Sequence, residues 1–192
     1  MINIAVFASG NGTTLQSIID NIQHKKLDVN ISLVVSNTKN AYALQRAKRA
    51  GIATYVIKTT TPAEMDAELV KILKDYKIDL ILLAGYLKLI GSGLINRYTI
   101  VNTHPALLPK FGGKGMYGMN VHRAVIAVGE KQSGVTLHFV NEHYDKGNII
   151  MQTKVKVAPN DTPESLAARV QAAEKIQLLK ALQKFAAGEL KA

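Results

Sequence analysis

Short apolar segments alternate with segments of helical periodicity along almost the whole chain, and this alternation restricts the possible folds more than any other feature. Apolar runs and alternations predict strands at residues 3–7, 29–35, 53–57, 80–84, 99–103, 133–140 and 149–157. Helical spacing predicts helices between most of these strands and a long helix near the C-terminus. Strands that alternate with helices form βαβ units. We therefore predict one domain over residues 1–192 with an α/β, Rossmann-like, doubly wound fold, in which helices cover both faces of a mostly parallel sheet.

Several helix starts carry capping signals. The segment 61–64, Thr-Pro-Ala-Glu, combines a capping box with proline at the first helical position. Asn40 is predicted to cap the preceding helix. Asp161 or Thr162 is predicted to cap the last helix, with Pro163 as its first residue.

The composition excludes several kinds of chemistry. The chain has no cysteine, which excludes disulfides, thiolate nucleophiles and cysteine-ligated metal sites. The first apolar run, residues 4–7, is too short for a signal peptide or a membrane span. We therefore expect a cytoplasmic protein without a membrane partner.

The formal net charge of +10 allows two interpretations. The charge could attract an acidic partner, such as nucleic acid, a phosphate or a polyglutamate tail, or it could be a solvated cationic surface. The lysines and arginines are scattered over predicted helix faces, and no basic run interleaves with aromatic residues. Nucleic acid is therefore the weaker interpretation, and we expect no nucleic-acid partner.

A glycine-rich turn, Ala-Ser-Gly-Asn-Gly-Thr-Thr-Leu at residues 8–15, joins the first strand to the first helix. Glycines let the backbone approach a ligand, and the start of a helix offers free N–H groups to a phosphate. A dinucleotide site would need glycine in place of Leu15 and an acid after the second strand, where Ser36 and Asn37 stand. The turn therefore favours a monophosphate, and a plain strand-to-helix turn is the alternative.

Asn102 and His104 stand two residues apart at the end of a predicted strand, so their side chains share one side of it. Pro105 biases His104 toward an extended backbone. Ligands of open α/β sheets lie at the carboxyl ends of the strands. A carboxamide beside an imidazole can stabilise an oxygen that acquires negative charge. The alternative is a core histidine bonded to a backbone carbonyl.

The other histidines and the loop aspartate give weaker signals. His138 alternates with apolar residues along its strand, and we interpret it mainly as structural. His24, His122 and His143 are interpreted as surface or helix residues. Asp145 lies in a predicted loop, where an aspartate is usually a turn former. The spacing of these residues does not suit a metal, so we predict no metal site.

Three motifs together resemble the folate-dependent formyltransferases. They are Asn-x-His-Pro-x-Leu-Leu-Pro at 102–109, Ser-Gly-x-Thr-x-His at 133–138 and Asp-x-Gly at 145–147. The turn at residues 9–13 and the similarity over residues 1–187 narrow the resemblance to the phosphoribosylglycinamide formyltransferases. The resemblance implies that 10-formyltetrahydrofolate donates a formyl group to the amine of glycinamide ribonucleotide, in a monomer or weak homodimer.

The resemblance also implies residue roles. The catalytic set would be Asn102, His104 and Asp145. The substrate phosphate would be held by Gly12, Thr13 and Thr14, and the glycinamide end by Glu174. The folate would contact Asn102 and the segment Leu87, Lys88, Leu89 and Ile90, and its pterin would be enclosed by that segment and the loop 141–145.

Three positions depart from the pattern of the family. Thr14 stands where many relatives have asparagine, and Lys88 where arginine is common, so a single ammonium replaces a guanidinium fork. The glycine-rich segment 111–118 is longer than usual. It is either a mobile surface loop or a lid whose Lys110 or Lys114 meets an anion.

The implied mechanism uses the substrate amine as the nucleophile. His104, protonated and oriented by Asp145, would donate to the oxyanion of the tetrahedral intermediate, with the Asn102 amide as a second donor. The proton could travel through His104 or through a water held by Asp145.

Three other functions stay open. Formyltetrahydrofolate hydrolase and methionyl-tRNA formyltransferase share the catalytic set, although we would expect an additional domain in each. A basic nucleotide- or RNA-binding module without catalysis is the alternative from another class.

Overall fold

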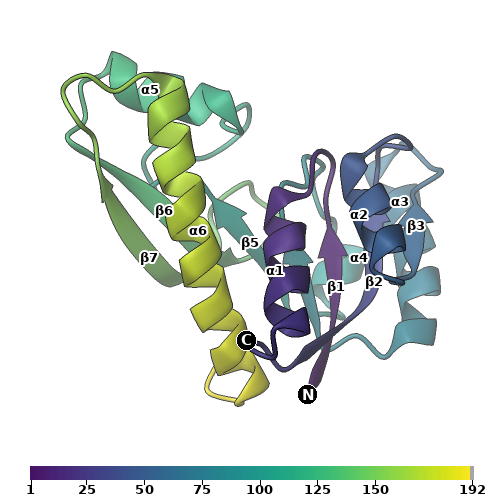
Figure 1. Cartoon of the computed structure of the whole chain (residues 1–192). Coiled ribbons are helices and arrows are strands. Elements are labelled where there is room, and N and C mark those ends of the chain that lie inside the picture. Colours follow the sequence, from purple (N-terminus) through teal and green to yellow (C-terminus); the bar gives the residue numbers. More distant parts are fainter. Residues whose placement is uncertain (191–192) are drawn as a thin grey trace.

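The computed structural model describes residues 1–190, which form a seven-stranded sheet flanked by helices (Figure 1). The strands are β1 (Ile2–Phe7), β2 (Val29–Ser36), β3 (Thr54–Val56), β4 (Leu80–Leu83), β5 (Ile100–His104), β6 (Gln132–Phe139) and β7 (Ile149–Lys156). The helices are α1 (Thr13–Gln23), α2 (Tyr42–Arg49), α3 (Pro62–Leu73), the 3-10 turn η1 (Lys74–Tyr76), α4 (Ser92–Ile95), α5 (Met119–Ala127) and α6 (Pro163–Ala186).

The sheet has the order β3-β2-β1-β4-β5-β6-β7. Strands β1 to β5 pair in parallel, whereas β6 pairs antiparallel with β5 and β7 antiparallel with β6. The mostly parallel, doubly wound α/β fold predicted from the sequence is therefore confirmed. The chain moves outward from β1 to β3 and then returns to the other side of β1 as β4, so the crevice for a ligand lies at the carboxyl ends of β1 and β4.

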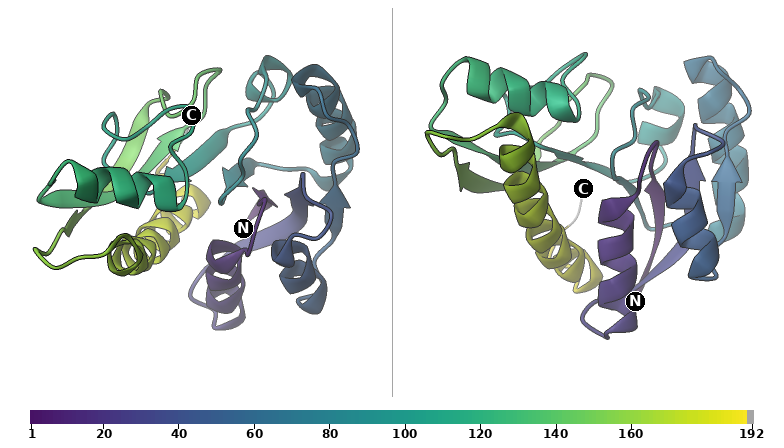
Figure 2. Two further views of the ribbon diagram at one scale, coloured as in Figure 1. Left: turned by 90° about the horizontal axis from the view of Figure 1, so that it is seen from above. Right: turned by 45° about the horizontal axis from the view of Figure 1, so that its top comes forward.

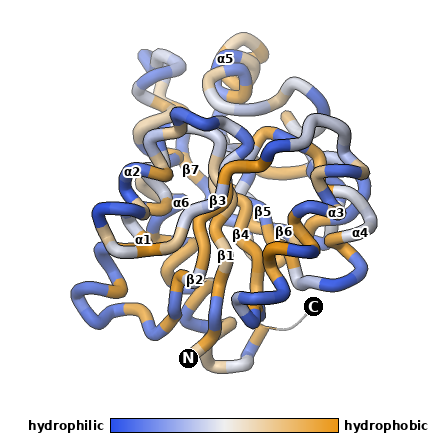
Figure 3. The backbone as a smooth tube through the Cα atoms, turned by 90° about the vertical axis from the view of Figure 1, so that its right-hand side faces the viewer, coloured by the Kyte–Doolittle hydropathy of each residue, from blue (hydrophilic) through white to orange (hydrophobic). Residues whose placement is uncertain are grey.

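Two apolar layers cover the two faces of the sheet. On one face, alternate residues of β1 such as Ile4 and Val6 pack with α1, α2 and the second half of α6. On the other face, Ala5 and Phe7 pack with α3 and α4. Figure 2 shows α1 and α6 on the same side of the sheet, and Figure 3 shows that hydrophobic residues concentrate in the central strands. Alternation along β1 thus reflects burial on both faces.

The helix starts agree with most of the capping signals. The Thr61 hydroxyl accepts a hydrogen bond from the Glu64 N–H, as the segment 61–64 predicts. Thr162 caps α6 and exchanges reciprocal bonds with Ser165. The prediction for Asn40 was wrong: α2 begins after Ala41, and no side chain caps it. Among residues 1–190, no helix combines the length and the apolar character that a membrane crossing requires.

Candidate active site

Strand β5 presents its residues alternately to the two faces of the sheet. The polar residues near its end therefore fall into two groups, one on each face. Thr103 donates its hydroxyl to Glu174 of α6 at 3.1 Å. Asn102 and His104 point to the other side, where both meet Asp145. The distance from His104 Nδ1 to Asp145 Oδ2 is 3.4 Å, and Asn102 Nδ2 lies 3.5 Å from Asp145 Oδ1. The structure therefore brings together the three residues of the expected catalytic set.

His138 belongs to the same cluster, contrary to its interpretation as mainly structural. It lies directly opposite Asn102 in the antiparallel pair of β5 and β6, and directly opposed residues share one face. Its Nδ1 is 2.8 Å from the Phe139 carbonyl, which can only accept, so Nδ1 carries a proton. Its Nε2 lies 3.0 Å from the Asn102 amide nitrogen and 3.6 Å from Asp145 Oδ1. An unprotonated Nε2 accepts from the Asn102 amide, whereas a protonated Nε2 donates to Asp145.

His104 is buried, and both of its ring nitrogens face acceptors. Nε2 donates to the Phe111 carbonyl at 2.7 Å, and Nδ1 faces the Asp145 carboxylate. Burial lowers the pKa of His104, while the Asp145 charge and the bond to Phe111 act in the opposite direction. The His104 ring is therefore oriented so that protonation of Nδ1 would produce an imidazolium that pairs with Asp145.

Asp145 is fixed in a loop after β6, with a side chain only 10% exposed. Its backbone has φ +56°, a left-handed conformation that non-glycine residues adopt rarely. Burial by itself would raise the pKa of Asp145, but His138, His104 and the Gly113 N–H, which donates to Oδ2 at 2.9 Å, outweigh it and lower the pKa. Asp145 is therefore an ionised acceptor that organises the cluster.

The glycine-rich segment 111–118 packs over the cluster through its backbone. Phe111 and Gly113 supply the carbonyl and N–H bonded to His104 and Asp145. A Cβ on Gly112 would approach the Asp145 Cβ to 3.2 Å, so glycine lets the segment pack closely there. Lys110 pairs with Glu130 at 2.7 Å. The sequence predicted a loop at residues 111–118, but it did not predict the backbone contacts of this loop with the cluster.

The turn after β1 has the geometry expected of a phosphate site. Gly12 has φ +67°, and a Cβ there would lie 2.7 Å from Ala43 of α2. No side chain caps the start of α1, so its first N–H groups, including those of Thr13 and Thr14, are available to a ligand. Arg46 supports the turn by donating to the Asn11 carbonyl at 2.8 Å, a contact that the sequence did not indicate.

Thr14 directs its hydroxyl to Glu174 rather than to the ligand side of the turn. The Thr14 hydroxyl donates to Glu174 Oε1 at 2.9 Å, and Thr103 bonds to the same oxygen. Burial raises the pKa of Glu174, while these two bonds oppose the change. Glu174 therefore lies between the phosphate turn and β5, and Thr14 can contribute only its N–H to a phosphate.

The expected folate segment follows β4 at the switch point of the sheet. Leu87 is 50% exposed, and its N–H donates to the Ser9 hydroxyl at 3.0 Å, which ties the segment to the end of β1. Lys88 is exposed and Leu89 half-buried. Ile90 is buried in the apolar layer with α3 and α4, so its side chain supports the segment from beneath.

The remaining histidines lie apart from this cluster or take no hydrogen-bonding part in it. His24 and His143 are exposed. His122 is a helix residue, one of the two positions expected for it: it lies on α5 and is buried, 3% exposed, with an unbonded Nδ1. No group of three or more metal-binding side chains is arranged to hold an ion within residues 1–190.

Comparison with known proteins places the chain in a family. The formyl transferase family matches residues 2–182. The phosphoribosylglycinamide formyltransferase of Escherichia coli is 34% identical over 194 residues, which cover 98% of this chain and 89% of that protein. The chloroplastic phosphoribosylglycinamide formyltransferase of Arabidopsis thaliana is 44% identical, with 87% of this chain covered. The chain spans 59% of the length of that plant relative and 55% of the relative from Vigna unguiculata.

A solved structure gives the same result. Glycinamide ribonucleotide transformylase 1 from Symbiobacterium toebii matches with a TM-score of 0.92 and 36% identity, covering 100% of this chain and 91% of that one. The resemblance drawn from the sequence motifs is confirmed, and the chain belongs to the formyl transferase family.

Proposed function

We propose that this protein, as a single domain over residues 1–192, transfers the formyl group of 10-formyltetrahydrofolate to the amine of glycinamide ribonucleotide. The observation that carries the proposal is the convergence of Asn102, His104 and Asp145 at the carboxyl end of β5. A turn suited to a monophosphate lies at the carboxyl end of β1 in the same sheet. The names of the relatives support the same substrate.

The substrate amine attacks the formyl carbon and produces a tetrahedral intermediate with an anionic oxygen. In the proposed mechanism, His104 and the Asn102 amide donate to this oxygen, and Asp145 orients both. His104 Nε2 is bonded to the Phe111 carbonyl, so this role requires the oxyanion to displace that carbonyl. The two hydrogens of Asn102 Nδ2 face His138 and Asp145, so the oxyanion must also replace one of these two acceptors. The proton of the amine then reaches the departing folate nitrogen through His104 or through a water held by Asp145.

The two substrates would occupy different parts of the crevice. The phosphate of the nucleotide accepts N–H bonds at Gly12, Thr13 and Thr14, and Glu174 meets the glycinamide end. The pterin lies between the segment 87–90 and the loop 141–145. The segment 111–118 acts as a lid, and Lys114, which is exposed, is its candidate anion contact.

A spectrophotometric assay tests the proposal. The protein is incubated with 10-formyltetrahydrofolate, and the absorbance of the deformylated folate is followed with glycinamide ribonucleotide, with methionyl-tRNA and without an acceptor. Deformylation that depends on the ribonucleotide is expected. Deformylation at the same rate without it would instead indicate a hydrolase, and deformylation only with methionyl-tRNA would indicate the tRNA enzyme.

Two further properties belong to the same proposal. The protein would act in the cytoplasm as a monomer or weak homodimer, with only small molecules as substrates. Sedimentation at micromolar and higher concentrations tests the oligomeric state. A higher, concentration-independent oligomer would contradict it.

A further inference from the structure

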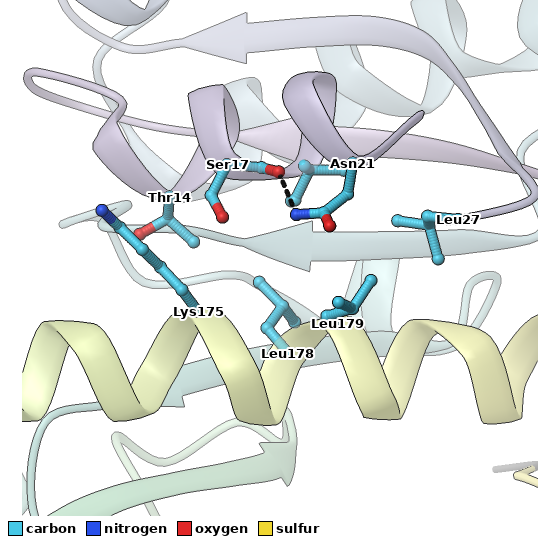
Figure 4. Close-up of a pocket in the computed structure, with 8 residues that line it drawn as sticks. Thr14, Ser17, Asn21, Leu27, Lys175, Leu178 and Leu179 are labelled. Atoms are coloured by element: carbon cyan, nitrogen blue, oxygen red, sulfur yellow. Dashed lines mark hydrogen bonds between the residues drawn. The ribbon is translucent and has the colours of Figure 1, made fainter. Parts of the chain in front are cut away.

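A cation that has no ion-pair partner among residues 1–190 lies beside the phosphate turn. Lys175 follows Glu174 on α6, and its side chain borders a small cavity together with Thr14 and Ser17 of α1. Figure 4 shows its stem extending from α6 along the start of α1, with the amine beside Thr14. Lys175 is exposed, and within residues 1–190 no carboxylate lies within ion-pair distance of it.

The charges around the turn make this position significant. A phosphate monoester carries up to two negative charges, whereas the start of a helix supplies the equivalent of only about half a positive charge. The Thr14 hydroxyl is already given to Glu174, so it cannot also donate to a phosphate. Glu174 would add a nearby negative charge when ionised.

Two other cations near the site already have hydrogen-bond or ion-pair partners. Arg46, on the opposite side of the turn, donates Nε to the Asn11 carbonyl and Nη1 to Gln16 at 3.0 Å. Lys110, near the catalytic cluster, is paired with Glu130. Of these three cations, Lys175 is the one that lines a cavity with the first turn of α1 and makes no ion pair within residues 1–190.

We infer that Lys175 binds the phosphate of the nucleotide substrate and makes the protein prefer a phosphorylated over an unphosphorylated acceptor. The inference rests on the proposed function, because it places that phosphate at the N-terminus of α1. The ammonium would supply the charged donor that the Thr14 hydroxyl cannot, opposite the N–H groups of the turn. Its position next to Glu174 would also reduce repulsion between that carboxylate and the phosphate.

The test compares glycinamide ribonucleotide with glycinamide riboside as formyl acceptors. Lys175→Ala is expected to raise KM for the ribonucleotide about 10- to 100-fold, the range for losing one hydrogen bond to a charged group. KM for the riboside, KM for the folate and kcat should stay near the wild-type values. Lys175→Arg should restore most of the preference for the phosphorylated substrate.

Lys180→Ala provides the matched control, because Lys180 is an exposed lysine on the same helix that does not border the cavity. It should leave both KM values unchanged. Equal losses with ribonucleotide and riboside in Lys175→Ala, or no loss with either, would overturn the inference.

A binding measurement separates this inference from the proposed function. Calorimetric titration with ribose 5-phosphate needs no formyl transfer, and Lys175→Ala should weaken that binding by a similar factor. If the wild-type protein fails to formylate glycinamide ribonucleotide yet shows this difference, the proposed function fails and the phosphate contact stands. Equal affinity for ribose 5-phosphate in the variant and the wild type contradicts the contact.

Discussion

Asn102 and His138 lie directly opposite each other on β5 and β6, with 3.0 Å between Asn102 Nδ2 and His138 Nε2. Asp145 approaches both side chains from the loop that follows β6. His138 therefore fixes the orientation of the Asn102 amide, which the proposed mechanism uses as an oxyanion donor.

Replacing His138 should reduce turnover through Asn102. We expect His138→Ala to lower kcat about 10- to 100-fold. Without His138, the Asn102 amide loses a hydrogen bond that holds its orientation, which costs roughly 1–3 kcal/mol of transition-state stabilisation. His138→Gln, which can still accept from Asn102, should recover part of the loss. Steady-state kinetics measure the effect, and His24→Ala, at an exposed site, is the control. Unchanged kcat in His138→Ala would remove His138 from the site.

Gly12 should be indispensable for the phosphate turn, whereas Gly10 should not. A Cβ at Gly12 meets Ala43 at 2.7 Å on a backbone with positive φ, while a Cβ at Gly10 meets nothing within 4 Å. Gly12→Ala is expected to destabilise the fold by about 1–3 kcal/mol and to raise KM for the nucleotide. Gly10→Ala should change both much less. Denaturant unfolding and steady-state kinetics measure the two effects, and equal behaviour of the variants would contradict the assignment.

Most elements of the fold could be predicted from the sequence because their causes are local. The apolar run at β4 and the Thr-Pro pairs before α3 and α6 act within a few residues. The antiparallel direction of β7 relative to β6 could also be predicted from the sequence. The segment 140–148 between β6 and β7 is too short for the crossover that parallel strands require.

The site was harder to predict because its contacts join distant segments. Alternation places Asn102 and His104 on one side of β5, but the position of Asp145 came only from the family resemblance. The register that sets His138 against Asn102 depends on how β5 and β6 pair, which no local pattern fixes. The contact of Arg46 with the phosphate turn is equally non-local.

Glu68 should make stability depend on pH in the acid range. Partial burial by itself would raise the pKa of Glu68, but bonds from Thr59, Tyr55 and the Lys58 N–H outweigh it and lower the pKa from 4.5 to about 2. Because the pKa of Glu68 is lower in the folded state, the ionised carboxylate adds to the free energy of unfolding above pH 4.5. This added stability is lost as pH falls toward 2.

We expect Glu68→Gln to lower the free energy of unfolding near pH 7 by on the order of 1 kcal/mol, because solvent screens this partly exposed group. The difference from the wild type should shrink between pH 4.5 and 2. Denaturant unfolding at several pH values measures it, with Asp75→Asn as an exposed control. A difference that stays constant over this range would contradict the role of the charge.

The most direct test of the proposed catalytic set is the turnover number of Asp145→Ala in formyl transfer to glycinamide ribonucleotide, with Asn102→Ala and the exposed-site variant Asp75→Asn measured alongside. Losing a group that organises the oxyanion donors should lower kcat about 100- to 1000-fold, with circular dichroism showing an intact fold. A folded Asp145→Ala protein that turns over at the wild-type rate would contradict the proposal that Asn102, His104 and Asp145 act together on one formyl carbon.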